Sequence, residues 1–174
     1  MPAKNSRKIY KENGFYHLYN RGVEKRSIFE DKQDYSVFLL YLKSYLLPKN
    51  VDALQEMLSD KNSTWNEKRL ILKQLRLNNF NKEISLLAYC LMPNHFHFIV
   101  KQTAPDSIDR FINSLNTRYV MYFNKKYDRV GPLFQGVYKA VVVETDEQLL
   151  YLSGYIHRNP LGSGSNAILQ GEAF

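Results

Sequence analysis

The sequence predicts an α+β fold in which helices pack on one face of an antiparallel sheet. Short runs of alternating apolar and polar residues, typical of half-buried strands, are interleaved with longer segments whose apolar residues recur every three or four positions, typical of helices. Their order along the chain is strand, helix, insertion, strand, strand, helix, strand, helix. That order fits a sandwich of ferredoxin-like type, and we expect residues 1–174 to form a single domain.

The N-terminal part supplies the first strand and the first helix. Residues 14–22 are rich in aromatic side chains and bounded by glycines, which predicts a strand. Residues 34–47 are predicted to form a helix, because their apolar residues recur at helical spacing, and Asp31 or Asp34 is the expected N-cap. Residues 51–81 are charged and weakly helical in two pieces, so we interpret them as an insertion, to which the sequence assigns no chemistry.

The middle of the chain predicts a β-hairpin. Residues 83–91 and 94–102 have strand character and are separated only by Met-Pro, so they pair as antiparallel neighbours in the middle of the sheet. Because side chains alternate along a strand, His95, His97 and Ile99 share one face while the intervening aromatic residues share the other. We expect the aromatic face to pack against the helices and the histidine face to stay open.

The C-terminal part completes the fold. The sequence predicts a helix over residues 105–126, a strand over 134–143 and a last helix that begins at Thr145, its N-cap, and ends at Asn159 before a proline. Residues 161–174, rich in Gly, Ser and Ala, are expected to form a tail.

The composition is that of a globular, basic protein. Of 174 residues, 44% are hydrophobic and 14% aromatic, and the formal net charge is +7. The positive charge is concentrated, because residues 1–26 hold seven Lys or Arg against two acidic residues and residues 101–139 hold seven against three. This distribution, with aromatic residues interleaved, favours a polyanionic partner.

Other features bear on the location of the protein. Cys90 is the single cysteine, which excludes an internal disulfide. The sequence contains neither the apolar segment of a signal peptide nor a run of ~20 apolar residues that would span a bilayer. We therefore expect a cytoplasmic protein that does not contact a membrane.

The histidines are candidate metal ligands. Two residues apart on a strand, His95 and His97 lie roughly 6 to 7 Å apart at the backbone, so both rings can reach one divalent ion. A His-x-His pair alone is weak, since it also arises by chance. Tyr151, Tyr155 and Asn159 recur every four residues on the last helix and therefore share one stripe that can face the histidines.

Four motifs in order carry a resemblance to a known family. They are Phe15–Gly22, Met92–His97, Arg129–Gln135 and Tyr155–Pro160. Together they closely resemble the single-tyrosine transposases of the HUH superfamily, particularly the group of REP-associated tyrosine transposases. Apart from the insertion, the match covers residues 15–160.

The resemblance implies a reaction and roles for its residues. By that resemblance His95 and His97 are metal ligands, Tyr155 is the nucleophile, and Asn159 stands at the position of a third ligand. Two imidazoles and an amide oxygen suit Mg²⁺ or Mn²⁺ acting as a Lewis acid. An unperturbed tyrosine, with a pKa of about 10, is a weak nucleophile at neutral pH and needs such help. The expected product is a 5′-phosphotyrosine link, which a 3′-hydroxyl can reverse.

The implied partner is single-stranded DNA, or a DNA hairpin with a single-stranded flank. Phosphate contacts and base stacking would hold such a ligand in a basic groove lined with aromatic residues. One tyrosine per chain makes one cut, so excision of an element with two ends favours a homodimer, whereas processing of one end does not. The candidate DNA-binding residues are Arg21, Lys25, Arg26, Arg110, Arg118, Arg129 and Lys139.

The sequence disfavours two other classes of metal-dependent hydrolase. Metallo-β-lactamase-like hydrolases need an Asp-His pair directly downstream, where this chain has Ile99 and Val100, and histidine-triad enzymes need a third histidine in place of Ile99. Two alternatives stay open. One is a nickase of the replication-initiator or relaxase type, which shares HUH chemistry. The other is a domesticated protein that binds DNA hairpins without cutting them.

Overall fold

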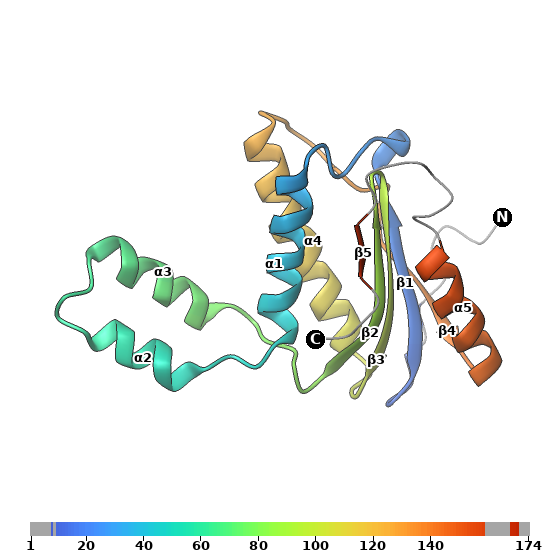
Figure 1. The fold of residues 1–174 in the computed structure, drawn as a ribbon, viewed down its shortest axis with the longest axis horizontal. Helices are drawn as coiled ribbons and strands as arrows, with labels where there is room; N and C mark the ends of the chain where they lie inside the picture. Colours follow the sequence, from blue (N-terminus) through green and yellow to red (C-terminus); the bar gives the residue numbers. More distant parts are fainter. Residues whose placement is uncertain (1–7, 9, 159–167, 171–174) are drawn as a thin grey trace.

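The computed structural model describes residues 8, 10–158 and 168–170, and it has a five-stranded antiparallel sheet with the strand order β4-β1-β3-β2-β5. The predicted α+β class is confirmed (Figure 1). None of the described helices is long and apolar enough to cross a bilayer. The strands are β1 (Phe15–Arg21), β2 (Ile84–Met92), β3 (His95–Gln102), β4 (Lys139–Val143) and β5 (Ile168–Gln170). The helices are η1 (Val23–Lys25), α1 (Lys32–Leu46), α2 (Val51–Ser59), α3 (Trp65–Arg76), α4 (Ser107–Lys126) and α5 (Asp146–Arg158).

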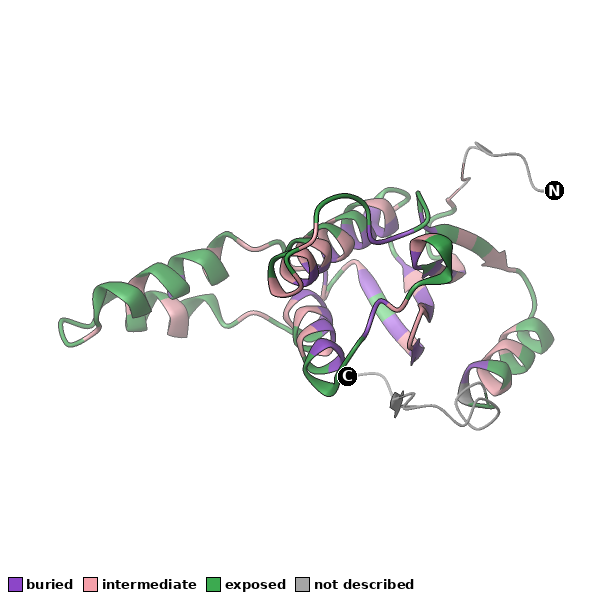
Figure 2. Cartoon of the chain, turned by 90° about the horizontal axis from the view of Figure 1, so that it is seen from above, coloured by how far each residue is buried: buried purple, intermediate pink, exposed green. Residues whose placement is uncertain are grey.

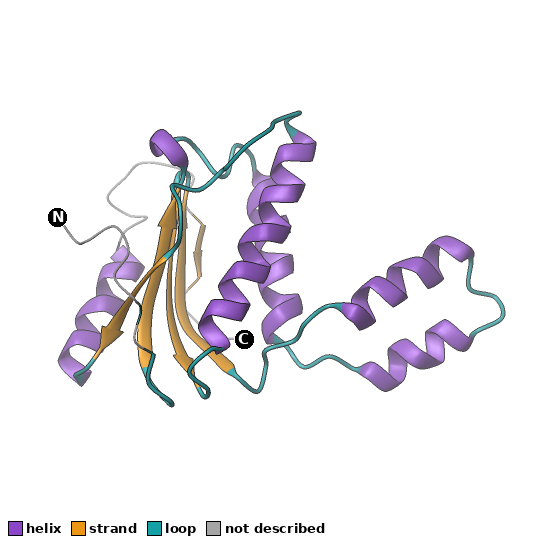
Figure 3. Cartoon of the chain, turned by 180° about the vertical axis from the view of Figure 1, so that it is seen from behind, coloured by secondary structure: helices purple, strands orange, loops and turns teal. Residues whose placement is uncertain are grey.

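Helices cover both faces of the sheet. α1 and α4 lie side by side on one face, as predicted, whereas α5 lies on the opposite face (Figures 1 and 3). The main core fills the space between the sheet and the α1–α4 pair, where Phe96 and Phe98 of β3 are fully buried. Phe38 of α1 packs against both of these rings, with centroids 5.6 and 6.2 Å away. The aromatic face of the predicted hairpin therefore packs against helices, as expected.

A second, smaller core attaches α5 to the sheet. Ile156 is 1% exposed and packs with Ala88, Cys90, Met92 and Ile99 from β2 and β3. These four side chains lie on the same face as the histidines, since Cys90 pairs with His97 and Ala88 with Ile99. α5 thus covers part of the face that the alternation alone left open, because this part is apolar.

Strand register aligns β1, and through it β4, with the central strand β3. β1 pairs with β3 so that Tyr19 lies opposite His97 and Arg21 opposite His95. β4 pairs with the other edge of β1, which places Lys139 opposite Tyr19. Since directly opposite residues point to the same face, side chains of β1, β3 and β4 gather on the histidine face.

The insertion forms a helical arm. As predicted, it contains two helices, α2 and α3, and they project away from the sheet (Figure 1). Thr64 and Glu67 form a capping box at the start of α3. In Figure 2 the arm is almost entirely coloured as exposed, and of the described residues of α2 and α3 only Ile71 is buried.

One strand boundary was predicted wrongly. The strand expected over residues 134–143 begins only at Lys139, and Phe134 makes an isolated bridge to Gly22. The cause is the backbone of Gly136, whose φ angle of 83° turns the chain away from an extended path.

The helix ends are close to those predicted. Asp31 is the N-cap of α1, since its Oδ1 accepts a hydrogen bond of 3.0 Å from the backbone N–H of Asp34. Thr145 begins α5 as expected, because its Oγ1 accepts a hydrogen bond of 3.2 Å from the backbone N–H of Gln148. Asn159, the predicted last residue of this helix, and the predicted tail of residues 161–174 lie outside the described residues, apart from β5.

A buried carboxylate joins α1 to α4. Asp34 is fully buried and accepts hydrogen bonds from the Tyr127 hydroxyl, the Tyr122 hydroxyl and the backbone N–H of Glu30, at 2.8, 3.0 and 2.8 Å. The Lys126 ammonium group lies 2.7 Å away and supplies the opposite charge. With four donors the carboxylate is well compensated, and the network fixes the end of α4 against the start of α1.

Candidate active site

The two histidines of β3 share one face, as the alternation predicted. The ring centroids of His95 and His97 are 5.0 Å apart and their planes are nearly perpendicular, at 89°. His97 is 8% exposed, whereas His95 is half-buried at the start of the strand. Two imidazoles are thus held close together by one stretch of β3.

A third histidine, which sequence reasoning missed, completes this cluster. His17 of β1 places its Nε2 2.8 Å from Nδ1 of His97, and the two rings stack with centroids 5.0 Å apart. Tyr19 stacks on both rings, at 4.9 Å from His17 and 5.8 Å from His97. The alternation in β1 does place His17, Tyr19 and Arg21 on one face, but only the register between β1 and β3 brings that face to His97.

Hydrogen bonds orient the two imidazoles of β3. Nδ1 of His95 lies 2.6 Å from Oδ1 of Asn94. Since an amide oxygen only accepts, the histidine Nδ1–H donates and the neutral ring keeps a lone pair on Nε2. In His97 it is again Nδ1 that is engaged, by His17, so its Nε2 has no partner among the described residues. A partner on the second nitrogen is what orients a metal-binding histidine.

The site keeps its imidazoles neutral. Burial lowers the pKa of His97 to about 3, and the adjacent His17 and His95 add to this effect. Burial also lowers the pKa of His17 to about 4, and burial followed by the charge of Arg21 lowers the pKa of His95. At neutral pH all three rings are uncharged, which is the form that binds metal ions.

Tyr155 of α5 lies next to this cluster, on the face of the sheet that carries the histidines. Its ring centroid lies 6.0 Å from that of His97, with the planes at 89°. The next residue, Ile156, is buried in the smaller core and therefore fixes the rotation of the helix. Tyr155 is 42% exposed and so remains accessible to a ligand, whereas Tyr151, one turn earlier, is 72% exposed.

Two of the three predicted metal ligands lie within the described residues. His95 presents a lone pair on Nε2, and His97 presents one in the tautomer whose Nδ1–H donates to Nε2 of His17, which fits a divalent ion. The third predicted ligand, Asn159, lies outside the described residues. Within the described part of the chain, no group of three or more His, Cys, Asp or Glu side chains is arranged to hold a metal. The predicted ligand set would therefore have to include the amide.

Five of the seven candidate DNA-binding residues lie at the end of the sheet near His95. Arg21 lies opposite His95, and its guanidinium group contacts the side chain of Gln135. Lys139 lies opposite Tyr19, with its ammonium group 5.8 Å from that ring. The remaining three occupy the turn after β1 and the loop after α4; they are Lys25, Arg26 and Arg129.

The other two candidates are engaged elsewhere. Arg110, in the first turns of α4, pairs with Glu83 and with Asp106, the latter at 3.0 Å. The guanidinium group of Arg118 lies 3.8 Å from the centroid of the Tyr41 ring and donates to the Ser44 hydroxyl. Since α4 covers the face opposite the histidines, the structure does not bring these two residues to the candidate site (Figure 1).

The fold, the site and the matching family model show that the chain is a transposase. More narrowly, the chain belongs to the IS200-like transposase family, whose model matches residues 61–159, more than half of the chain. This agrees with the resemblance seen in the sequence motifs. No curated protein matched the chain.

Two solved structures are similar to this chain. One is a REP-associated tyrosine transposase bound to a REP hairpin, with a TM-score of 0.58 and 12% sequence identity, covering 92% of this chain and 74% of that chain. It shows that the fold is shared. The other is assigned to a transposase of Deinococcus radiodurans R1, with a TM-score of 0.41 and 18% identity, covering 88% of this chain and 95% of that chain.

Proposed function

We propose that this transposase cuts and rejoins single-stranded DNA with Tyr155 as the nucleophile. The observation that carries the proposal is the approach of Tyr155 to His97, with ring centroids 6.0 Å apart. A phenol that is accessible, next to a pair of neutral imidazoles, supports a covalent mechanism in which metal ligands and nucleophile act on one phosphate.

In this proposal His95, His97 and Asn159 would hold Mg²⁺ or Mn²⁺. The ion, when bound, would polarise the scissile phosphate and neutralise charge that develops on its oxygens. The low pKa values of His95 and His97 support this role, because neutral rings bind metal without first losing a proton. Asn94 and His17 would orient the two ligands through their Nδ1 atoms.

The covalent step needs no reactant other than the DNA strand and the Tyr155 side chain. The Tyr155 oxygen attacks the phosphorus, a bond forms between this oxygen and the 5′-phosphate, and the bond to the 3′-oxygen breaks. The proton of the phenol leaves to solvent, and the departing 3′-oxygen takes up a proton to become a hydroxyl. Attack of this or another 3′-hydroxyl on the phosphotyrosine reverses the step, so strand transfer needs no ATP.

The proposed ligand is single-stranded DNA or a hairpin with a single-stranded flank. A related fold binds a REP hairpin, and Arg21 and Lys139, which lie on the histidine face opposite His95 and Tyr19, offer phosphate contacts near the proposed site. The binding face would therefore be formed by Arg21, Lys25, Arg26, Arg129 and Lys139. Two chains, each with one such tyrosine, would act together as a homodimer where two ends are excised.

The test is a denaturing gel with labelled hairpin oligonucleotides, taken from repeats beside the gene, in the presence of Mn²⁺. We expect a covalent protein–DNA band with the native chain and none with Tyr155→Phe. A band that survives in Tyr155→Phe would remove this residue from the proposed role. DNA binding without a band in the native chain would instead support the hairpin-binding protein that does not cut.

A further inference from the structure

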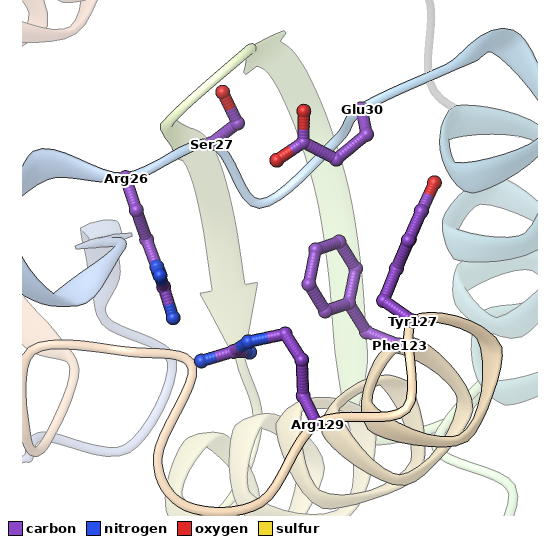
Figure 4. Close-up of a pocket in the computed structure, with 6 residues that line it drawn as sticks. All are labelled: Arg26, Ser27, Glu30, Phe123, Tyr127 and Arg129. Carbon is purple, nitrogen blue, oxygen red and sulfur yellow. The ribbon is translucent and has the colours of Figure 1, made fainter.

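A small cavity lies at the end of the sheet where the cations gather. It has a volume of about 420 Å³ and lies between the loop after η1 and the end of α4. Figure 4 shows the guanidinium groups of Arg26 and Arg129 pointing toward one another on one side, with Glu30 and Ser27 on the other. The rings of Phe123 and Tyr127 complete the lining. The cavity is large enough for a small ligand and has a cationic side and an acceptor side.

The walls of this cavity are held in place by the fold. Arg129 donates to Oδ1 of Asn124 at 3.1 Å and lies 5.6 Å from the Phe123 ring. The buried carboxylate of Asp34 binds both the hydroxyl of Tyr127 and the backbone N–H of Glu30. A preformed site of this kind loses little conformational entropy when a ligand binds.

The turn that carries Arg26 is also tightly built. A side chain at Gly22 would place its Cβ 2.1 Å from the carbonyl oxygen of Arg26, so only glycine fits. Glu24 and Lys25 both have positive φ angles, of 55° and 60°. Backbone strain of this kind is often found at binding sites, where the surrounding structure enforces it.

The charged side chains that line the cavity are not engaged in ion pairs among the described residues. Among the described residues, none of Arg26, Glu30 and Arg129 takes part in an ion pair within 4.0 Å. A ligand that carries both an anionic group and an N–H donor would satisfy the two sides at once. A nucleotide whose base carries an exocyclic amino group has this combination, since its phosphate is anionic and its amino group donates.

Hydrogen bonds join the loop that lines the cavity to the turn that precedes His95. The backbone N–H groups of Ile28 and Phe29 both donate to the carbonyl oxygen of Pro93, at 2.7 and 3.0 Å. The next residue, Asn94, donates to the carbonyl oxygen of Lys25 at 3.2 Å while its Oδ1 accepts from His95. A ligand in the cavity would thus be anchored at a fixed position relative to the histidines.

We propose that this cavity binds one nucleotide of the DNA strand, with the phosphate between Arg26 and Arg129 and the amino edge of the base at Glu30. The ring of Tyr127 provides an apolar surface beside the base. The subsite would hold one nucleotide of the bound strand and favour cytosine, whose exocyclic amino group donates to a carboxylate, over thymine, which has no such group. The identity of the nucleic acid rests on the proposed function.

The first experiment measures the phosphate contact by fluorescence anisotropy of labelled dC12 and dT12, with EDTA present so that no cleavage occurs. Homopolymers present the same base in every register. We expect the double variant Arg26→Gln/Arg129→Gln to bind both oligonucleotides at least about ten-fold more weakly, and the slope of log K against log salt to fall by about 0.7, as for one lost phosphate. Lys125→Gln, which removes a nearby charge outside the cavity, should change binding less than about two-fold.

The second experiment measures the base contact as the ratio of the dC12 and dT12 affinities. The native chain should prefer dC12, and Glu30→Ala should bring the ratio close to one. Glu24→Ala, which removes an acidic charge from the preceding η1 turn, outside the cavity lining, should leave the ratio unchanged. A general change in charge strengthens binding of both oligonucleotides equally, so this ratio isolates the base contact.

The proposal is overturned if the double variant binds as well as Lys125→Gln, or if Glu30→Ala leaves the ratio unchanged. Thermal unfolding and the single variant Arg129→Lys, which keeps the charge, check that a loss of binding is not a loss of fold. The covalent-band assay separates this proposal from the proposed function. Absence of the band in the native chain counts against Tyr155 only, whereas a band with unchanged affinities in the double variant counts against the cavity only.

Discussion

His97 of β3 and Tyr155 of α5 meet with their rings perpendicular and their centroids 6.0 Å apart, on a face that no single element of the fold could form. The strand presents the imidazole, and the smaller core beneath α5 positions the phenol. The Tyr155 hydroxyl is therefore the first group to test by substitution.

Replacing Tyr155 by Phe should abolish covalent capture of DNA while leaving its equilibrium binding within about two-fold of the native chain. The variant keeps the ring that packs beside His97 and loses only the attacking oxygen. Tyr151→Phe is the matched control, since Tyr151 lies one turn earlier on α5 and is more exposed. Loss of the covalent band in Tyr151→Phe with retention in Tyr155→Phe would exchange their roles.

Replacing His17 by Ala should weaken Mn²⁺ binding about 10- to 100-fold, the usual effect of removing a residue that orients a ligand. His17 holds Nδ1 of His97 at 2.8 Å, and without it the imidazole can rotate. Isothermal titration of the native and variant chains with Mn²⁺ measures this directly. His97→Ala gives the reference for a lost ligand, and a His17→Ala affinity equal to that of the native chain would contradict the orienting role.

Replacing Lys126 by Met should lower the free energy of unfolding by about 3–5 kcal/mol, because it removes the cation that compensates a buried carboxylate. Asp34 is fully buried, and the Lys126 ammonium group lies 2.7 Å from it. Denaturant unfolding gives the measurement.

Asp31→Asn is the control for that experiment. Asp31 binds the same ammonium group at 2.7 Å, but its side chain is 50% exposed, so its loss should be much less destabilising. Asparagine also preserves the N-cap of α1. Equal losses in the two variants would show that burial of Asp34 does not set the strength of this network.

Cys90 should resist alkylation until the protein unfolds. The thiol is fully buried, and burial raises its pKa from 9.0 to about 11, so the reactive thiolate is scarce at neutral pH. Because the pKa of Cys90 is higher in the folded state than in the unfolded state, its contribution to the free energy of unfolding is complete below pH 9 and is lost as the pH rises toward 11.

Mass spectrometry of iodoacetamide-treated protein, at increasing urea concentration, measures that reactivity. Labelling should follow the global unfolding curve, and Cys90→Ala supplies the unlabelled reference. Rapid labelling in the absence of urea would show that α5 opens locally and uncovers the smaller core, to which Cys90 belongs.

Two glycine substitutions should have opposite effects. In Gly22→Ala the added Cβ would lie 2.1 Å from the carbonyl oxygen of Arg26, so the turn that carries Arg26 must shift. Both the free energy of unfolding and the affinity for DNA should therefore fall. In Gly154→Ala the Cβ meets only the Arg158 side chain, at 3.7 Å, within helix α5. There alanine should stabilise the protein by about 0.5–1 kcal/mol. Thermal unfolding distinguishes the two, and destabilisation by Gly154→Ala would contradict the packing of α5.

Much of the fold was predictable because its signals are local. The alternation in β3 predicted that Phe96 and Phe98 face the core while His95 and His97 share the other face, and both are confirmed. Caps and spacing located the helices within a few residues. The strand expected over residues 134–143 was wrong at its start, because Gly136 turns the chain there and periodicity does not report φ angles.

The candidate site was less predictable because it depends on contacts between distant segments. His17 was missed since its proximity to His97 follows from the register of β1 against β3. Charge alone could not separate Arg110 and Arg118, which are engaged on the α4 side, from Arg26 and Arg129, which face one cavity.

The class of fold, the resemblance to a transposase family and the residues expected to react could all be read from the chain, because spacing and motif order are properties of the chain. Which side chains meet depends on the three-dimensional packing. The face chosen by α5, the pairing of His17 with His97 and the cavity between Arg26 and Arg129 depend on strand register and helix packing. These are set by burial of apolar surface contributed by several segments together, which no local pattern encodes.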